Sequence, residues 1–90
     1  MDKITVKHIL ENEIQEKEIR TWSTWSCNKS EFPWEYSERE SCYILEGQVE
    51  VTTDDGDVVS FGPGDFVVFP QGLKCTWKVK QAVYKYFLFG

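Results

Sequence analysis

The chain lacks the long hydrophobic segments that mark membrane and secreted proteins. Its apolar stretches, such as "DFVVFP" and "YFLF", are short, whereas a membrane-spanning helix needs about 20 consecutive apolar residues. The first residues, "MDKITVKHILEN", contain no hydrophobic region of the kind that a secretory signal requires. We therefore expect a cytoplasmic protein without a membrane partner.

Basic residues are also scarce. The chain has 10 lysines and arginines against 15 aspartates and glutamates, which gives a formal net charge of −5, and its basic residues form no cluster. Proteins that bind nucleic acid rely on a basic patch that neutralises backbone phosphates. The composition thus predicts no nucleic-acid partner.

Histidine and cysteine, two common ligands of transition metals, are few. The single histidine is His8, and the three cysteines are Cys27, Cys42 and Cys75, none of them in a Cys-x-x-Cys pair. An odd number of cysteines without such a pair argues against a disulfide framework and against a zinc ribbon. We expect three reduced thiols, as in other cytosolic proteins.

Large apolar side chains are abundant. Hydrophobic residues make up 41% and aromatic residues 16% of the composition, with four Trp, four Tyr and six Phe. These side chains supply a dense core to a chain whose length suits one compact domain. The prediction is a single domain over residues 1–90 that folds without disulfides or metal.

The hydrophobic pattern indicates β-strands along most of the chain. "KITVK" alternates polar and apolar residues, and "HILENEIQEKEIR" after it suits one or two helical turns. Asp55-Gly56 is typical of a tight hairpin turn, and the proline in "EFPWEY" indicates an edge strand or a bulge. We interpret "SCYILEG" and "QVEVTT" as two strands separated by Gly47. Short strands with regular turns predict an all-β sandwich or barrel.

Two segments resemble the signature motifs of the cupin superfamily. The first cupin motif has His-x-His, then a glutamate, then a glycine after six further residues. In "ERESCYILEGQVEV", Glu40 is followed by six residues and Gly47, which fits this spacing. Counting back from Glu40 places Trp34 and Tyr36 at the two histidine positions. An equally permitted spacing places Pro33 and Glu35 there instead.

The second cupin motif consists of a glycine, five residues, Pro-x-Gly, two residues and a histidine. "FGPGDFVVFPQGLKCTWKV" fits it with Gly64, Pro70 and Gly72, and Cys75 occupies the histidine position. More narrowly, this segment, "WEYSERESCYILEGQVEV" and "YKYFLF" are similar to small single-domain cupins related to ureidoglycine aminohydrolase domains, many of which have no assigned activity. The resemblance implies an all-β cupin jelly-roll barrel, the double-stranded β-helix.

In such a barrel, strand alternation decides which side chains point inward. The predicted inward residues are Trp34, Tyr36, Glu40, Cys42 and Ile44 from the first motif, and Cys75, Trp77 and Val79 from the second. A shift of one residue within 33–36 would reverse the face of that segment.

The resemblance implies a metal site of three histidines and one carboxylate, but only the carboxylate, Glu40, is retained. The indole of Trp34 has no lone pair to offer a cation. Tyr36 would have to ionise about three pH units below its usual pKa of ~10, and Cys75 would add a single thiolate. We therefore predict neither a bound metal nor another cofactor.

The remaining side chains predict an aromatic pocket with few polar groups, as in small-molecule sites at barrel mouths. The predicted ligand-binding residues are Trp34, Tyr36, Glu40, Cys75, Trp77 and Lys85. Aromatic rings stack on planar or sugar-like ligands and attract cations, and Glu40 would anchor an amine, amide or hydroxyl. The leading hypothesis is a metal-free small-molecule-binding cupin.

Two other functions stay open. One is an enzyme, aminohydrolase-like or acting on another small metabolite, with Glu40 as its candidate catalytic acid or base and with or without a divalent metal. The other is a structural or interaction module, either a monomer or a homodimer paired through the apolar "YFLF" segment.

Each candidate residue also has a purely structural interpretation. The aromatic rings would fill a narrow barrel, and Cys75 would be a packing thiol. Glu40 would pair with Lys85 or Arg39, or hydrogen-bond to a tyrosine hydroxyl, because a lone buried carboxylate is costly. Lys85 itself would be solvated on an edge strand.

Overall fold

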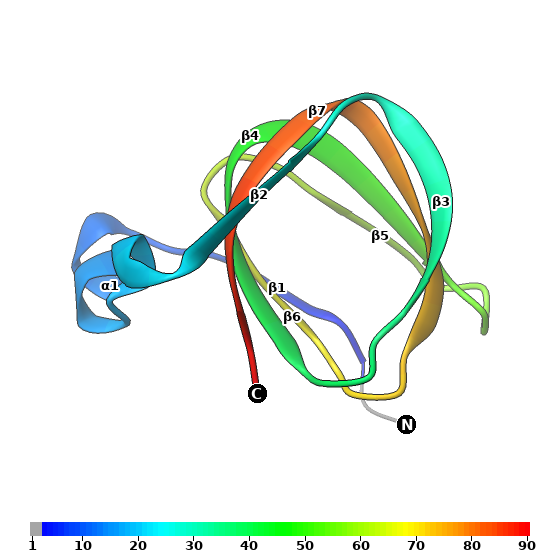
Figure 1. Ribbon diagram of the computed structural model, residues 1–90, viewed down its shortest axis with the longest axis horizontal. Helices are drawn as coiled ribbons and strands as arrows, with labels where there is room; N and C mark the ends of the chain where they lie inside the picture. Colours follow the sequence, from blue (N-terminus) through cyan, green and yellow to red (C-terminus); the bar gives the residue numbers. More distant parts are fainter. Residues whose placement is uncertain (1–2) are drawn as a thin grey trace.

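The structure is a computed structural model that describes residues 3–90, and its strands curve around a common interior (Figure 1). One short helix and one 3₁₀ turn interrupt the strands near the start of the chain. The elements are β1 (Thr5–His8), α1 (Glu11–Glu16), the 3₁₀ turn η1 (Ile19–Thr21), β2 (Ser23–Cys27), β3 (Ser30–Glu35), β4 (Glu40–Thr53), β5 (Val58–Phe61), β6 (Asp65–Phe69) and β7 (Lys74–Phe89). The all-β prediction is confirmed, and so are the one or two helical turns after β1.

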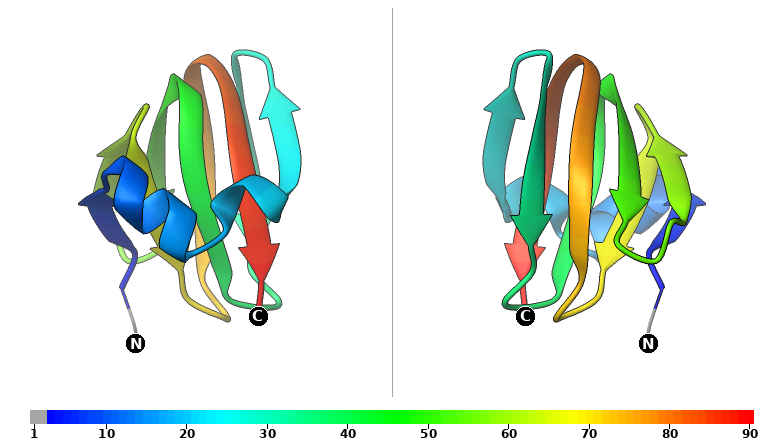
Figure 2. Two further views of the ribbon diagram at one scale, coloured as in Figure 1. Left: turned by 90° about the vertical axis from the view of Figure 1, so that its left-hand side faces the viewer. Right: turned by 90° about the vertical axis from the view of Figure 1, so that its right-hand side faces the viewer.

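All strand pairs are antiparallel, and the two longest strands, β4 and β7, form the centre of the sheet. The main order is β1-β6-β4-β7-β2, while β5 pairs with the second half of β4 and β3 pairs with the first half of β7. The side views show how the long strands bend, so that their two halves contribute to different walls (Figure 2). β3, which carries Pro33, pairs with β7 alone and is an edge strand, as its proline predicted.

The bend occurs where β4 crosses β7 at a bulge. The pairing between these strands shifts register between Ile44 and Val49, and Gly47 has a φ of 101°. A side chain at Gly47 would collide with the backbone of Ala82 and Val83 on β7, so that only glycine fits the crossing. The prediction of two strands separated by Gly47 was therefore wrong, because the bulge lets one strand continue through the glycine.

The predicted turns are present. The Gly56 amide donates to the Thr53 carbonyl at 2.9 Å and closes the hairpin between β4 and β5. The Asp65 amide donates to the Gly62 carbonyl at 3.1 Å in the turn before β6. These are the two turns that the sequence places around "DDGD" and "GPGD".

The segment with α1 and η1 lies against the outer face of the sheet (Figure 2, left). Three buried isoleucines, Ile9, Ile14 and Ile19, form a small core there. They pack against partly buried rings on the outside of the sheet and before β2, namely Trp22, Tyr43, Phe66 and Tyr86. The apolar residues that give this segment its weak helical period thus have a packing role, because they cover rings that point out of the barrel.

The main core fills the interior of the barrel. Its buried members come from β4 to β7 and from the segments beside β3 and β7, and they are Tyr36, Cys42, Ile44, Val49, Val51, Phe61, Val67, Phe69, Leu73, Cys75, Trp77, Val79 and Val83. Seven of the eight residues predicted to face inward are buried, and Trp34 is the exception. Within residues 3–90, none of the helices has the length and apolarity to cross a bilayer.

Candidate functional site

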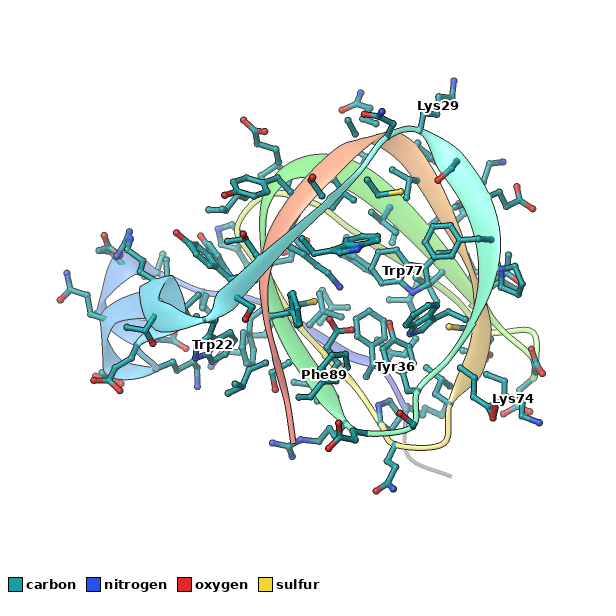
Figure 3. The ribbon with its side chains drawn as sticks, in the orientation of Figure 1. Trp22, Lys29, Tyr36, Lys74, Trp77 and Phe89 are labelled. Atoms are coloured by element: carbon teal, nitrogen blue, oxygen red, sulfur yellow. The ribbon has the colours of Figure 1, made fainter. Side chains whose placement is uncertain are left out.

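One pocket of about 240 Å³ opens into the barrel interior. Seven of its lining residues are aromatic and two are charged: they are Trp25, Phe32, Trp34, Tyr36, Glu40, Trp77, Lys85, Phe87 and Phe89. Trp34 is 49% exposed, Phe89 45% and Trp25 36%, whereas Tyr36 and Trp77 are buried. The exposed rings therefore form the mouth of the pocket and the buried ones its inner wall. Figure 3 labels Phe89 of the mouth, and Tyr36 and Trp77 of the inner wall.

Pairing between β3 and β7 decides which residues of the first motif face the pocket. Phe32 lies opposite Trp77, and Trp34 lies opposite Cys75. Trp34 and Tyr36 line the pocket, while Pro33 and Glu35 are exposed and do not. Of the two motif spacings, the one that places Trp34 and Tyr36 at the histidine positions describes this structure.

The inner wall is a set of packed rings with satisfied polar atoms. Trp77 Nε1 donates a hydrogen bond to Tyr36 Oη at 3.1 Å. Tyr36 stacks on Phe69 with ring centroids 4.8 Å apart, and Phe32 stacks on Trp77 at 6.1 Å. Burial, followed by the negative charge of Glu40, raises the pKa of Tyr36 well above its usual value. Tyr36 is therefore a neutral phenol at physiological pH.

Two opposite charges lie side by side in the pocket. Lys85 Nζ on β7 donates to Glu40 Oε2 on β4 at 2.8 Å, and each residue is only 4% exposed. Lys85 sits between strands on both sides, opposite Ile44 on β4 and Trp25 on β2. The structural alternative, a solvated lysine on an edge strand, does not hold, because β2 continues the sheet beyond β7. The alternative pairing of Glu40 with Lys85 is present, and the one with Arg39 is not.

Three rings surround the Lys85 ammonium. Its Nζ lies 4.7 Å from the ring centroid of Trp77, 5.0 Å from that of Trp25 and 5.9 Å from that of Phe87. Ring faces attract cations within about 6 Å, and more strongly where water is excluded. Together with Glu40 these rings make up the contacts of the Lys85 amino group in the pocket.

Four lining residues, Trp25, Phe32, Phe87 and Phe89, were not among the predicted site residues. A signal for three of them was present in the sequence, because Phe87 and Phe89 have the same strand parity as Lys85, and Phe32 has that of Trp34 and Tyr36. No comparable signal exists for Trp25, since β2 is short and mostly exposed and its place beside β7 depends on the topology of the sheet.

Cys75 is not part of the pocket lining. It is 3% exposed and belongs to the core, where burial raises the pKa of its thiol to about 11, with smaller effects of Asp54 and Glu40. A thiol of this kind is neutral at physiological pH and is not a reactive nucleophile. The structure thus corrects the sequence prediction at Cys75, which acts as a packing side chain.

The residues present do not fit the metal site of histidine-bearing cupins. Trp34 and Tyr36 stand at two of the histidine positions and Cys75 at the third, and Lys85 is hydrogen-bonded to the carboxylate of Glu40. Within the described part of the chain, no three His, Cys, Asp or Glu side chains gather closely enough to hold an ion. An ammonium group occupies the place beside the acid where a cation would bind.

Comparison with solved structures gives both the fold and a relative. A DUF861 family protein from Thermotoga maritima is 40% identical, with a TM-score of 0.96 over 98% of this chain and 100% of its own. The EutQ protein of Clostridium difficile (18% identity, TM-score 0.69) aligns over 96% of this chain and 66% of its own. A putative ethanolamine utilization protein Q of Salmonella typhimurium (16% identity, TM-score 0.67) aligns over 98% and 69%. The last two similarities show the fold alone.

Comparison with curated proteins found no match. The model of the EutQ-like cupin domain matches residues 14–87, which is most of the chain. The cupin resemblance is thereby confirmed, whereas the narrower similarity to ureidoglycine aminohydrolase domains stays a prediction. With its jelly-roll barrel and its 40% identical relative, this chain belongs to the EutQ-like cupin family.

Proposed function

We propose that this cupin binds a small molecule in its aromatic pocket without the help of a metal. The observation that carries the proposal is the pocket itself, in which seven aromatic side chains and one buried ion pair surround a space with an open mouth. Small-molecule sites in proteins share this composition, with apolar walls and a few placed polar groups.

The size of the pocket limits the ligand. Its volume of about 240 Å³ exceeds the roughly 150 Å³ of an apolar cavity that binds benzene. It is smaller than the about 300 Å³ at which typical ligand sites begin. One ring with a short substituent fits such a space, and a larger molecule would extend through the mouth.

The exposed rings argue against mere filling of the barrel. Trp25, Trp34 and Phe89 keep a third to a half of their surface in contact with solvent, although each has apolar area that a ligand would cover. The Glu40–Lys85 pair supports the same view, because a buried ion pair often contributes less stability than apolar residues of similar volume. A polar anchor for a ligand gives both features a purpose.

We also assign the protein to the cytoplasm. All three cysteines are free in the structure, and two of them, Cys42 and Cys75, are buried in the core. A reducing compartment keeps them in this state.

Indole N–H signals in a ¹⁵N-labelled sample test the proposal, because the four tryptophans report on different places. A library of small planar and sugar-like metabolites is added, and each compound is scored on these signals. A ligand in the pocket shifts the signals of Trp25, Trp34 and Trp77 and leaves that of Trp22, which packs in the outer core. If no compound shifts the first three signals or raises the melting temperature, the proposal fails.

Elemental analysis of untagged protein tests the metal-free part. We expect manganese, iron and zinc well below one equivalent per chain, because the Lys85 ammonium occupies the site beside Glu40. Stoichiometric metal would contradict this expectation and favour the enzyme hypothesis instead.

A further inference from the structure

We infer that the pocket selects an uncharged planar ligand that carries a hydrogen-bond donor and an acceptor side by side, such as the primary carboxamide of a ring compound. This inference rests on the proposed function and specifies its ligand class. Three observations support it: the rings already hold a cation, the charges in the pocket sum to zero, and the ion pair offers two complementary partners.

The aromatic walls are not free to bind a cationic ligand. The rings of Trp25, Trp77 and Phe87 already surround the Lys85 ammonium at 4.7–5.9 Å. A ligand ammonium would have to share these rings with Lys85 at short distance, and two like charges repel strongly where water is excluded. The cation–π interactions that these rings can make are therefore already made with Lys85.

The charge balance of the pocket also opposes an anion. Glu40 and Lys85 are the charged residues of the lining, and their formal charges cancel. A carboxylate ligand could approach Lys85 only close to the carboxylate of Glu40. Any charged ligand would leave a net charge with few partners in an apolar space, which is costly.

The ion pair has hydrogen-bonding capacity left for a neutral ligand. Its 2.8 Å bond uses Oε2 of Glu40 and one proton of Lys85 Nζ. The second carboxylate oxygen remains an acceptor, and the ammonium carries two more protons. A carboxamide matches this pair, because its N–H₂ group donates to Glu40 while its carbonyl oxygen accepts from Lys85. A carboxylate offers only acceptors and an amidinium only donors.

Three probes of nearly identical shape separate these cases: benzamide is neutral, benzoate is an anion and benzamidine is a cation at pH 7. Each is titrated into the ¹⁵N-labelled wild-type protein, and dissociation constants are taken from the indole signals of Trp25, Trp34 and Trp77. We expect benzamide to bind at least about tenfold more tightly than either charged probe, because only the charged probes leave an uncompensated charge.

Substitutions of the pair should reverse this preference. Lys85→Met leaves Glu40 without its partner and frees the ring site, so that benzamidine becomes the tightest of the three probes. Glu40→Gln leaves the ammonium unpaired, so that benzoate becomes the tightest. The matched control is the exposed pair of Lys80 and Glu50, whose Nζ and Oε2 atoms are 2.9 Å apart, close to the 2.8 Å of the buried pair. Lys80→Met and Glu50→Gln should leave the order of the three probes unchanged.

The outcomes separate this inference from the proposed function. If benzoate or benzamidine binds the wild-type protein as tightly as benzamide, the ligand class is wrong while a small-molecule pocket stands. If none of the three probes shifts the pocket signals at millimolar concentration, the ligand class is also wrong, and the metabolite library decides the proposed function. Should a substituted protein fail to fold, the three wild-type titrations still decide.

Discussion

The outer and inner faces of the sheet carry aromatic rings in different surroundings. On the outer face, Tyr43 and Tyr86 are covered by the isoleucines of the α1 and η1 segment. On the inner face, Trp34 and Phe89 at the pocket mouth remain about half exposed. Neighbouring residues of β7 show the contrast directly, since Tyr86 packs in the outer core and Lys85 lies in the pocket.

The chain covers Tyr43 and Tyr86 with a segment of its own. Tyr84, on the same face of β7 as Tyr86, lies outside this cover and is 37% exposed. The rings of the inner face line a pocket beside the main core, and the mouth of this pocket is open. The inner face is the one at which we propose that a small molecule binds.

Separating the ion pair of the inner face should have the largest effect on stability. Glu40→Gln or Lys85→Met leaves one buried charge without its partner, and we expect each to lower the free energy of unfolding by about 3–5 kcal/mol. The double substitution removes both charges and should restore stability close to that of the wild type. Urea unfolding of the four proteins measures these values.

The exposed pair of Lys80 and Glu50 is the control for this experiment. Its atoms are separated by 2.9 Å, close to the 2.8 Å of the buried pair. Exposed ion pairs contribute about 0–1 kcal/mol. A buried pair that behaved like this control would show that water reaches Glu40 and Lys85 freely.

Opening the outer core should have the second-largest effect. Ile19 is fully buried between the η1 turn and the outer rings, and Ile19→Ala should lower the free energy of unfolding by about 2–3 kcal/mol. Ligand binding in the pocket should persist, because the outer core lies on the other side of the sheet. Loss of binding in a folded Ile19→Ala protein would mean that the two faces are coupled.

The buried thiols predict a loss of stability at high pH. Burial raises the pKa of Cys42 to about 12 and that of Cys75 to about 11, from an unperturbed value of 9.0. Above pH 9 the unfolded chain loses these protons and the folded chain retains them, so that stability falls as the pH rises. Between pH 9 and pH 11 each thiol should account for up to about 2 kcal/mol.

Urea unfolding between pH 8 and pH 11 with a reductant tests this prediction. A Cys42→Ala, Cys75→Ala protein should lose less stability over that range than the wild type. Cys27→Ala is the control, because Cys27 is only half-buried, and it should follow the wild-type curve. Parallel curves for all three proteins would contradict the assignment of the thiols.

Trp34→Ala should have the smallest effect on stability and a large effect on binding. The ring is half exposed and makes one edge contact with Tyr36, so that its removal should change the free energy of unfolding by less than about 1 kcal/mol. Binding of any pocket ligand should be lost, because the mouth loses one wall. Trp22→Ala, which opens the outer core, should show the opposite pattern of lower stability and retained binding.

The sequence predicts the turns and the strands well because local conformation decides them. Gly64 and Gly72 adopt positive φ angles at the positions that the second motif requires. The same local reasoning wrongly divides β4 at Gly47. This glycine is explained by the close contact with Ala82, which lies on β7, 35 positions further along the chain.

The site was only partly predictable for a similar reason. Strand parity correctly placed Glu40, Tyr36 and Trp77 in the interior. It could not show that Lys85 lies inside, because this depends on β2 lying beside β7 and bringing Trp25 over the ammonium. Cys75 has the right parity and is buried, but it does not line the pocket, and parity does not tell which inward residues do.

The bulge at Gly47 also determines which two charged residues meet. It fixes the alignment of β4 on β7, so that Glu40, seven positions before the glycine, meets Lys85, three positions after Ala82. One residue inserted between Glu40 and Gly47 would turn the Glu40 carboxylate toward water. The Lys85 ammonium would then be left without its partner among the aromatic rings. The interval between acid and glycine, usually regarded as a fold signature, here also determines which polar group the cavity contains.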